Sequence, residues 1–112
     1  MDKKEIIDRI GIIRNRVNLS ARALSLLAGL NAGYINRLES KKDFLPSLEA
    51  FLDILEVCNV TPEEFFYNNF SDYSQDKEII DLLKTTSIEK KEIVLSILRL
   101  NKWHLTILIT QT

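Results

Sequence analysis

The sequence has few of the residues that most catalytic and metal sites require. Its 112 residues include one cysteine, one histidine and three glycines. Cys58 and His104 lie far apart in the chain, so they predict no metal-ligand cluster, and a single cysteine excludes an internal disulfide. The glycines do not form a phosphate-binding loop of the G-x-x-x-x-G-K type. We therefore expect a protein that is not an enzyme and uses no cofactor or metal.

Long apolar runs are also missing. A membrane-spanning helix needs about 20 predominantly apolar residues in succession, and no stretch of this sequence approaches that length. Asp8 and Arg9 interrupt the apolar residues near the start, which excludes the core of a signal peptide. With the single cysteine, these absences predict a soluble cytoplasmic protein that makes no use of a membrane.

Charge is distributed unevenly along the chain, although the formal net charge is −1. Between Arg9 and Lys42 there are seven basic residues and one acid, Glu39, so this segment carries +6 and the remainder carries −7. A net charge near zero argues against a nucleic-acid partner, whereas a basic segment of this kind indicates a surface that meets an anion. An ordinary solvated basic surface is the alternative.

Apolar residues recur at helical spacing along nearly the whole sequence, which predicts an all-α protein. Helices are expected to begin near Ile6 and directly after Ser20 and Ser47, whose hydroxyls can accept a backbone amide proton at a helix start. The residues expected to face inward in the first five helices are Ile6, Ile10, Ile13, Val17, Leu24, Leu27, Ala28, Ile35, Leu38, Leu48, Phe51, Leu52, Leu55, Phe65 and Phe66.

Local signals predict further helix boundaries. Gly29 follows the helix expected over 21–28 and is suited to a positive φ, and Asn31 is the candidate cap for a helix over 32–40. Thr61 starts the motif Thr-Pro-Glu-Glu, which combines an N-cap threonine, a proline at the first helical position and a glutamate three residues after the cap. This motif predicts a short fifth helix. Cys58 is expected to fill the core.

The polar segment 68–74 predicts a boundary, followed by helices over about 75–84 and after Ser87. The last helix is apolar on more than one side, and such a helix must be covered. We therefore assign residues 1–70 to one domain and 71–112 to a C-terminal helical extension that mediates dimerisation, with completion of the monomer core as the alternative. The residues expected in the dimer contact are Ile93, Ile97, Leu100, Trp103 and Ile107.

Residues 20–38 meet the physical requirements of a helix-turn-helix unit, in which the second helix can enter the major groove of DNA. Ser25 and Ala28 are small where the two helices must cross, and Gly29 supplies the turn. Ile35 and Leu38 can anchor the second helix on the core. This arrangement leaves four residues facing outward, namely Ala32, Gly33, Asn36 and Arg37.

At these positions the sequence resembles the phage-repressor/Cro-type regulators, also called the xenobiotic-response-element family. The resemblance covers about residues 6–66 and is carried by segments 19–25, 28–31, 34–39, 46–49 and 60–65. It implies a five-helix lambda-repressor-like DNA-binding domain, here with two further C-terminal helices. It also implies a sequence-specific transcriptional regulator, a repressor in our interpretation, that binds double-stranded operator DNA as a homodimer with helix 31–40 in the major groove.

The resemblance further implies roles for individual residues. The expected base contacts are Ala32, Gly33, Asn36 and Arg37. The expected phosphate contacts are Ser20, Ala21, Arg22, Tyr34, Lys41 and Lys42. Arg14 and Glu39 occupy positions where some members form a buried salt bridge between the first and third helices.

The chain departs from the family pattern at two positions. Many members have glutamine at the first position of both helices of the unit, where this sequence has Ala21 and Ala32. Base readout would then depend on Asn36 and Arg37, and a good bidentate contact is worth ~1–3 kcal/mol of discrimination. Alternatives are a protein-interaction module of the same fold (an antitoxin-like or anti-repressor partner) with little or no DNA binding, a regulator with a peptide or protein effector, and a small enzyme.

Overall fold

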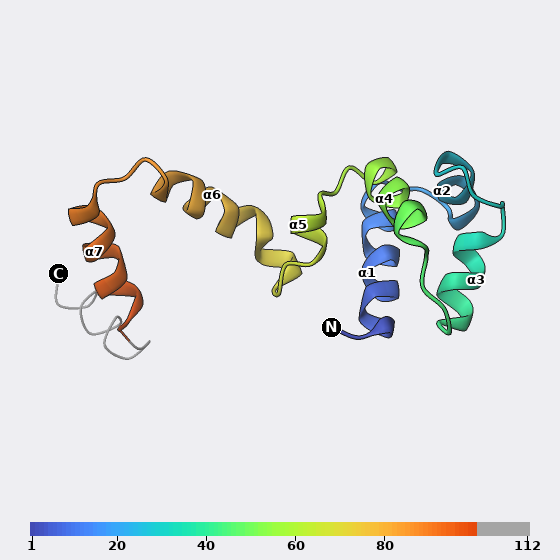
Figure 1. Cartoon of the computed structure of the whole chain (residues 1–112), viewed down its shortest axis with the longest axis horizontal. Coiled ribbons are helices and arrows are strands. Elements are labelled where there is room, and N and C mark those ends of the chain that lie inside the picture. The colour runs from blue at the N-terminus through green and yellow to red at the C-terminus, as the bar shows by residue number, and fades with distance from the viewer. Residues whose placement is uncertain (101–112) are drawn as a thin grey trace. The chain divides into compact units, whose positions relative to one another are not determined.

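The computed structural model describes residues 1–100, which form seven α-helices and no β-strand (Figure 1). The predicted all-α fold is confirmed. The chain divides after Phe70 into two compact units, each described here by itself. The first contains α1 (Lys3–Arg16), α2 (Ala21–Leu27), α3 (Tyr34–Lys41), α4 (Leu48–Val57) and α5 (Pro62–Phe65). After a 3-10 helix (Phe70–Asp72), the second contains α6 (Tyr73–Leu83) and α7 (Ile88–Leu98).

Short-range side-chain caps explain where most of these helices begin. Ser20, Ser47 and Thr61, each predicted as a cap, accept a hydrogen bond from the backbone N–H three residues further on. Asp2 does the same for α1, which therefore begins at Lys3 rather than near Ile6 as the sequence suggested. The capping oxygen satisfies an amide that has no partner within the helix, so each cap stabilises its helix start by about 1 kcal/mol.

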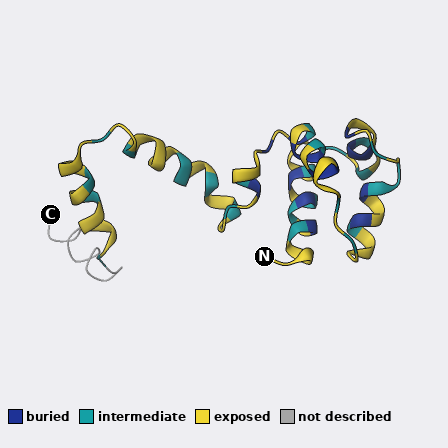
Figure 2. Cartoon of the chain, in the orientation of Figure 1, coloured by how far each residue is buried: buried dark blue, intermediate teal, exposed yellow. Residues whose placement is uncertain are grey.

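The core of the first unit lies where α1, α2, α3, α4 and α5 meet (Figure 2). Phe51 of α4 packs edge-on against Phe65 of α5, with the ring centroids 4.9 Å apart. Cys58 is buried, as predicted, and burial raises the pKa of its thiol. The side chains with essentially no exposure are Ile7, Ile10, Ile13, Leu24, Ile35, Leu38, Ile54 and Phe65.

Five residues expected in the core are exposed instead: Val17, Leu27, Leu48, Leu52 and Phe66. The buried line of α2 is formed by residues 24, 25 and 28, and at 100° per residue the side chain at 27 points about 110° away from its centre. In α4 the buried line runs through residues 50, 51, 54 and 55, so residues 48 and 52 face solvent. The spacing of apolar residues therefore predicts correctly that α2 and α4 are amphipathic, but it misplaces the centre of the buried face on each of these two helices.

The second unit has no buried residue in the part that the structure describes. Its apolar side chains are largely exposed, among them Ile79, Leu82 and Ile88. Of the residues predicted to mediate dimerisation, Ile93 and Ile97 are exposed on α7, and Leu100 follows that helix half-buried. Trp103 and Ile107 lie outside the described residues. Within residues 1–100, no helix has the length and apolar character needed to cross a membrane.

Candidate nucleic-acid interface

A tight turn joins α2 to α3. Gly29 takes a φ of +73°, as predicted for the residue after a helix end. The amide of Leu30 donates to the carbonyl of Ser25 at 2.8 Å, which closes the end of α2. Since a side chain at position 29 would be strained at this φ, the turn that places α3 depends on glycine.

Ser25 connects the two helices from within the core. Its side chain is fully buried; the hydroxyl donates to the carbonyl of Ala21 at 2.8 Å and accepts from the amide of Ile35 at 3.0 Å. The second bond satisfies an amide in the first turn of α3, which otherwise has no partner within the helix. The sequence predicts only that position 25 holds a small residue. The bond between its hydroxyl and the amide of Ile35 spans ten positions, so no local pattern indicates it.

The helix that follows begins later than expected. It starts at Tyr34, not at Asn31 or Ala32, and it extends to Lys41. The side chain of Asn31 accepts from the amide of Gly33 at 3.1 Å and so stabilises a turn ahead of the helix rather than capping it. Ala32 and Gly33, predicted to contact bases, therefore lie in this turn at the entrance to α3.

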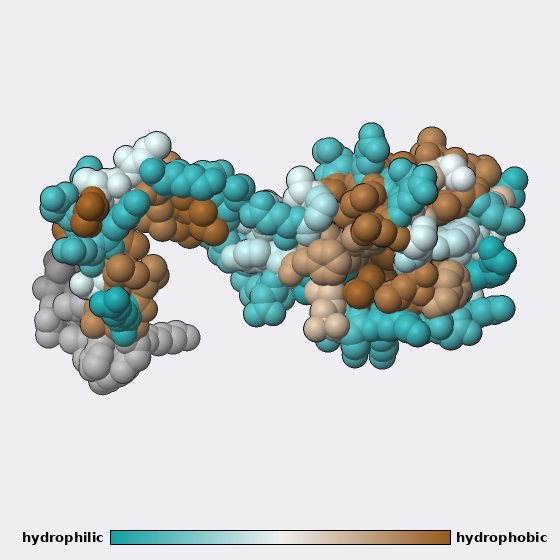
Figure 3. All heavy atoms as spheres, viewed as in Figure 1, coloured by the Kyte–Doolittle hydropathy of each residue, from teal (hydrophilic) through white to brown (hydrophobic). Residues whose placement is uncertain are grey.

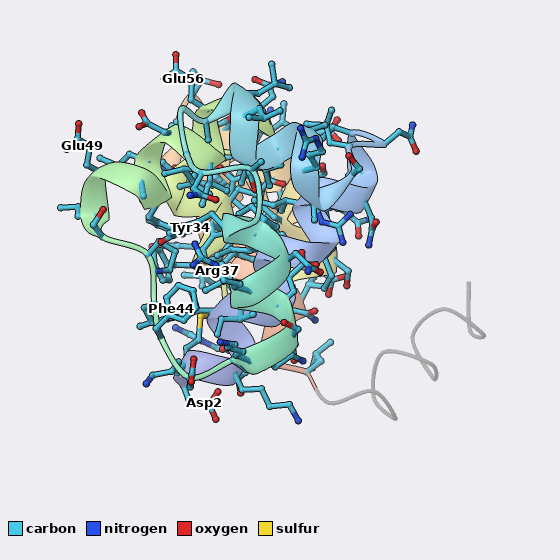
Figure 4. All side chains as sticks on the ribbon, turned by 90° about the vertical axis from the view of Figure 1, so that its right-hand side faces the viewer. Asp2, Tyr34, Arg37, Phe44, Glu49 and Glu56 are labelled. Atoms are coloured by element: carbon cyan, nitrogen blue, oxygen red, sulfur yellow. The ribbon has the colours of Figure 1, made fainter. Side chains whose placement is uncertain are left out.

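Helix α3 separates an apolar side from a polar one. Ile35 and Leu38 are buried against the core, whereas Asn36, Arg37 and Lys41 are exposed. Residues 37 and 41 are four positions apart and so share one face of the helix. Figure 4 shows α3 toward the viewer with Arg37 on its outer side. The free face of α3 is thus polar and cationic.

Arg14 of α1 holds α3 in place through Glu39. The guanidinium makes two bonds to the carboxylate, from Nε to Oε1 at 2.9 Å and from Nη2 to Oε2 at 3.0 Å. Nη1 also donates to the carbonyl of Leu19, ahead of α2. The two side chains are only 17% and 24% exposed. Two parallel hydrogen bonds between a guanidinium and a carboxylate are stronger and more directional than a single charged hydrogen bond. The structure thus brings these two predicted residues together, and their ion pair forms a brace that connects α1 to α3.

Two of the basic residues in the +6 segment serve the fold rather than a ligand. Arg9 donates from Nη1 to the carbonyls of Phe65 at 2.7 Å and Tyr67 at 2.6 Å, at the end of α5. Arg16 pairs with Glu64 at 3.0 Å. The two guanidinium carbons lie 5.0 Å and 4.4 Å from the ring centroid of Phe70. These contacts tie α1 to the segment that follows α5.

Lys42 also has an internal partner. It ends α3 in the left-handed conformation, with φ of 54°, and its amine lies 2.8 Å from the carboxylate of Asp8. The hydrogen bond from Lys42 holds the pKa of Asp8 below its usual value. Both side chains are exposed, and exposed pairs of this kind contribute little to stability. Lys42 can therefore exchange this carboxylate for a phosphate at small cost.

Three basic residues of the segment remain without a partner. Within the described residues, no hydrogen bond or ion pair engages the side chains of Arg22, Arg37 or Lys41, and all three are exposed. They belong to α2 and α3, the two helices of the helix-turn-helix unit. Within the +6 segment, the positive charge that is available to an outside ligand therefore lies on this unit.

Tyr34 stands at the start of α3, half-buried, with its ring edge-on to Phe44 at 5.8 Å (Figure 4). Burial raises the pKa of its phenol, against a weaker opposing effect of Arg37. The hydroxyl is therefore protonated at neutral pH and can donate a hydrogen bond to an anion. Ser20 and Ala21, also predicted at phosphates, form the start of α2, where the Ser20 hydroxyl accepts from the amide of Ala23 at 3.0 Å.

The comparison with protein families supports the same interpretation of these helices. A helix-turn-helix family model matches residues 10–65, half of the chain. The chain therefore belongs to the helix-turn-helix family of the phage-repressor/Cro type, as the sequence indicated, and its first unit has the lambda-repressor-like fold. This is a family of DNA-binding regulators, not of enzymes. No curated protein and no solved structure matches the chain.

Proposed function

We propose that the protein is a cytoplasmic repressor that binds operator DNA as a homodimer and reads it with α3 in the major groove. Residues 1–70 form the DNA-binding domain, and residues 71–112 form the extension that pairs two copies. The observation that carries this proposal is the exposed set Arg22, Arg37 and Lys41 on α2 and α3. Cations that have no internal partner can neutralise phosphates or donate to bases.

Direct base readout in this proposal is sparse. Arg37 can donate to O6 and N7 of a guanine, and Asn36 can pair with an adenine. Ala32 can contact a thymine methyl group from the turn before α3, and Gly33 beside it lets the backbone approach the base edges. Two polar side chains per domain give modest specificity, so a second domain on an adjacent half-site is needed for operator selection.

Phosphate contacts surround the base-reading residues. Arg22 and Lys41 are free to make them, and Lys42 can join them by releasing Asp8. The phenol of Tyr34 donates from the start of α3. The full proposed set of phosphate contacts is Ser20, Ala21, Arg22, Tyr34, Lys41 and Lys42.

Pairing of two copies is proposed to use the apolar surface of α7. Ile93 and Ile97 are four residues apart on that helix and are exposed, and Leu100 follows. Apolar side chains of this size favour burial by about 1.5–3 kcal/mol each. Trp103 and Ile107, outside the described residues, complete the proposed set.

Selection of binding sites from random duplexes with the full-length protein tests the function. We expect one enriched sequence with two half-sites, and an affinity that falls by about 0.9 log unit per log unit of salt for each phosphate neutralised. The competing function is a protein-interaction module of the same fold, favoured by the exposed apolar side chains of α6 and α7. That function predicts no enriched sequence and a weak dependence on salt.

A further inference from the structure

The start of α3 lacks a cap from the residue that precedes the helix. Five other helices, α1, α2, α4, α5 and α7, follow a residue whose side-chain oxygen accepts from the backbone amide three positions further on. Gly33 precedes α3 and has no side chain to supply such an oxygen. Because the first amides of a helix have no partner within the helix, the helix proposed to read DNA needs an acceptor from another part of the unit.

Ser25 of α2 supplies this acceptor. Its hydroxyl oxygen lies 3.0 Å from the amide nitrogen of Ile35, which is ten positions further along the chain and in the first turn of α3. The amide of Tyr34, one residue earlier, donates to the carbonyl of Asn31 at 2.9 Å and is satisfied within the turn before the helix. The bond between Ser25 and Ile35 therefore caps α3 from a different helix and ties its start to α2.

The same hydroxyl also contacts the start of α2. It donates to the carbonyl of Ala21 at 2.8 Å. A serine hydroxyl has a single hydrogen and two lone pairs, so the bond to Ala21 uses the hydrogen and leaves a lone pair for the amide of Ile35. Ala21 belongs to the first turn of α2, which the proposed function places at a DNA phosphate. Ser25 is thus bonded to both of the turns that the proposed function brings to DNA.

The surroundings of Ser25 are apolar. Ser25 and its neighbours Leu24 and Ile35 are fully buried, and Figure 3 shows further apolar side chains on the surface over α2 and α4. A buried amide without a partner is costly, so without the hydroxyl the backbone at Ile35 gains by moving until its amide meets water. The position of the first turn of α3 therefore depends on the hydroxyl of Ser25.

We propose that Ser25 is a positioning residue for DNA recognition, because it fixes the base-reading turn of α3 relative to the phosphate-binding turn of α2. This inference rests on the proposed function, in which both turns contact the same duplex. Arg14 holds α3 near its other end through Glu39. Ser25 and Arg14 together hold the helix at two separated points, which sets the angle at which it enters the major groove.

Base contacts depend on this position more than phosphate contacts do. Asn36 directly follows Ile35, and its short side chain cannot compensate for a shift of the backbone. Hydrogen bonds weaken steeply outside a narrow range of distance and angle. Arg22 and Lys41, in contrast, carry long side chains that can follow a phosphate. A displaced start of α3 should therefore lower the affinity for the selected operator and leave the affinity for random duplex nearly unchanged.

The test compares Ser25→Ala with Ile54→Val in the full-length protein. Alanine removes the hydroxyl and adds no atom, so it brings no steric conflict into the buried site. Ile54 is equally buried, in α4, and the loss of one methyl group there controls for a loss of core stability. Thermal melts followed by circular dichroism identify a temperature at which both variants and the unchanged protein are folded, and all measurements are made at that temperature.

Two measurements decide the outcome. In Ser25→Ala, hydrogen exchange followed by NMR should be about tenfold faster at the amide of Ile35 but unchanged at the amide of Phe51, which donates to the carbonyl of Ser47 in α4. Binding titrations should show about a fivefold loss of affinity for the selected operator and less than about a twofold loss for random duplex, whereas Ile54→Val should retain both affinities.

A loss that is equal on the two duplexes, or no loss on either, would overturn the proposal. If the unchanged protein binds no duplex at low salt, the proposed function fails. The exchange rate at Ile35 then still decides whether Ser25 holds the start of α3, because an unchanged rate in Ser25→Ala would contradict that role.

Discussion

Arg14 and Glu39 lie 25 positions apart in the chain and face each other across α1 and α3 in a two-pronged ion pair, at 2.9 Å and 3.0 Å. Because Arg14 also donates to the carbonyl of Leu19, one guanidinium joins α1, the segment before α2, and the helix proposed to enter the major groove. An arginine engaged by internal hydrogen bonds is thus the one that positions the helix proposed to read DNA.

Arg14→Ala is expected to lower the free energy of unfolding by about 2–3 kcal/mol, because it leaves Glu39 partly buried without its partner. Arg14→Lys should recover only part of this loss, since an ammonium cannot form the paired fork. Denaturant unfolding followed by circular dichroism measures both. Arg22→Ala, which breaks no internal contact, serves as the control and should change stability by less than about 0.5 kcal/mol. Equal stability of the Arg14 and Arg22 variants would show that the brace is not structural.

Arg37→Ala and Lys41→Ala should affect DNA binding in different ways. Loss of a bidentate base contact costs ~1–3 kcal/mol on the selected operator and little on random duplex, so Arg37→Ala should reduce sequence preference. Lys41→Ala should weaken both duplexes alike and lower the salt slope by about 0.9. Fluorescence anisotropy titrations over a salt series separate the two patterns. A uniform loss for Arg37→Ala would place that residue at a phosphate.

Arg9→Ala should destabilise the first unit by about 2 kcal/mol, because two carbonyls at the end of α5 lose a charged donor and Phe70 loses a cation over its ring. Arg9→Lys should not restore this stability fully, because Nη2 of Arg9 also donates to the carbonyl of Asn68 at 3.2 Å, and one ammonium cannot replace donors on two nitrogens. Operator affinity measured well below the melting temperature should stay unchanged. A loss of operator affinity under conditions in which the variant is still folded would mean that Arg9 contacts a phosphate after all.

Asp8→Asn should strengthen DNA binding at low salt. It removes an acid and leaves Lys42 with no carboxylate to release, so affinity should rise while the salt slope stays nearly unchanged if Lys42 contacts a phosphate in both proteins. The pKa of Asp8 is lowered, so the pair with Lys42 is complete at neutral pH and is lost only as the pH falls below the usual range of a carboxyl group. Binding titrations at pH 7 therefore compare a fully paired with an unpaired Lys42. Asp53→Asn, which removes an acid from α4, controls for net charge and should raise the affinity less than Asp8→Asn does.

Much of the fold could be predicted from residues close together in sequence. Ser20, Ser47 and Thr61 cap helices through bonds to amides three positions away, and Gly29 adopts the positive φ that ends α2. Such interactions depend on neighbouring residues alone, so the pattern predicts them. The predicted start of α3 is wrong because the local signal there is ambiguous. Asn31 can cap a helix or stabilise a turn with almost the same local bonds.

The availability of each basic side chain was decided by tertiary structure. Seven bases in one segment look alike in sequence, yet Arg9 and Arg16 are engaged by residues around α5, Arg14 by Glu39, and Lys42 by Asp8. Those partners lie 25 to 59 positions away, and only the packing of the helices brings them within hydrogen-bond distance. Local patterns can therefore place a charge on a helix, but folding determines whether that charge meets another part of the protein or remains free for DNA.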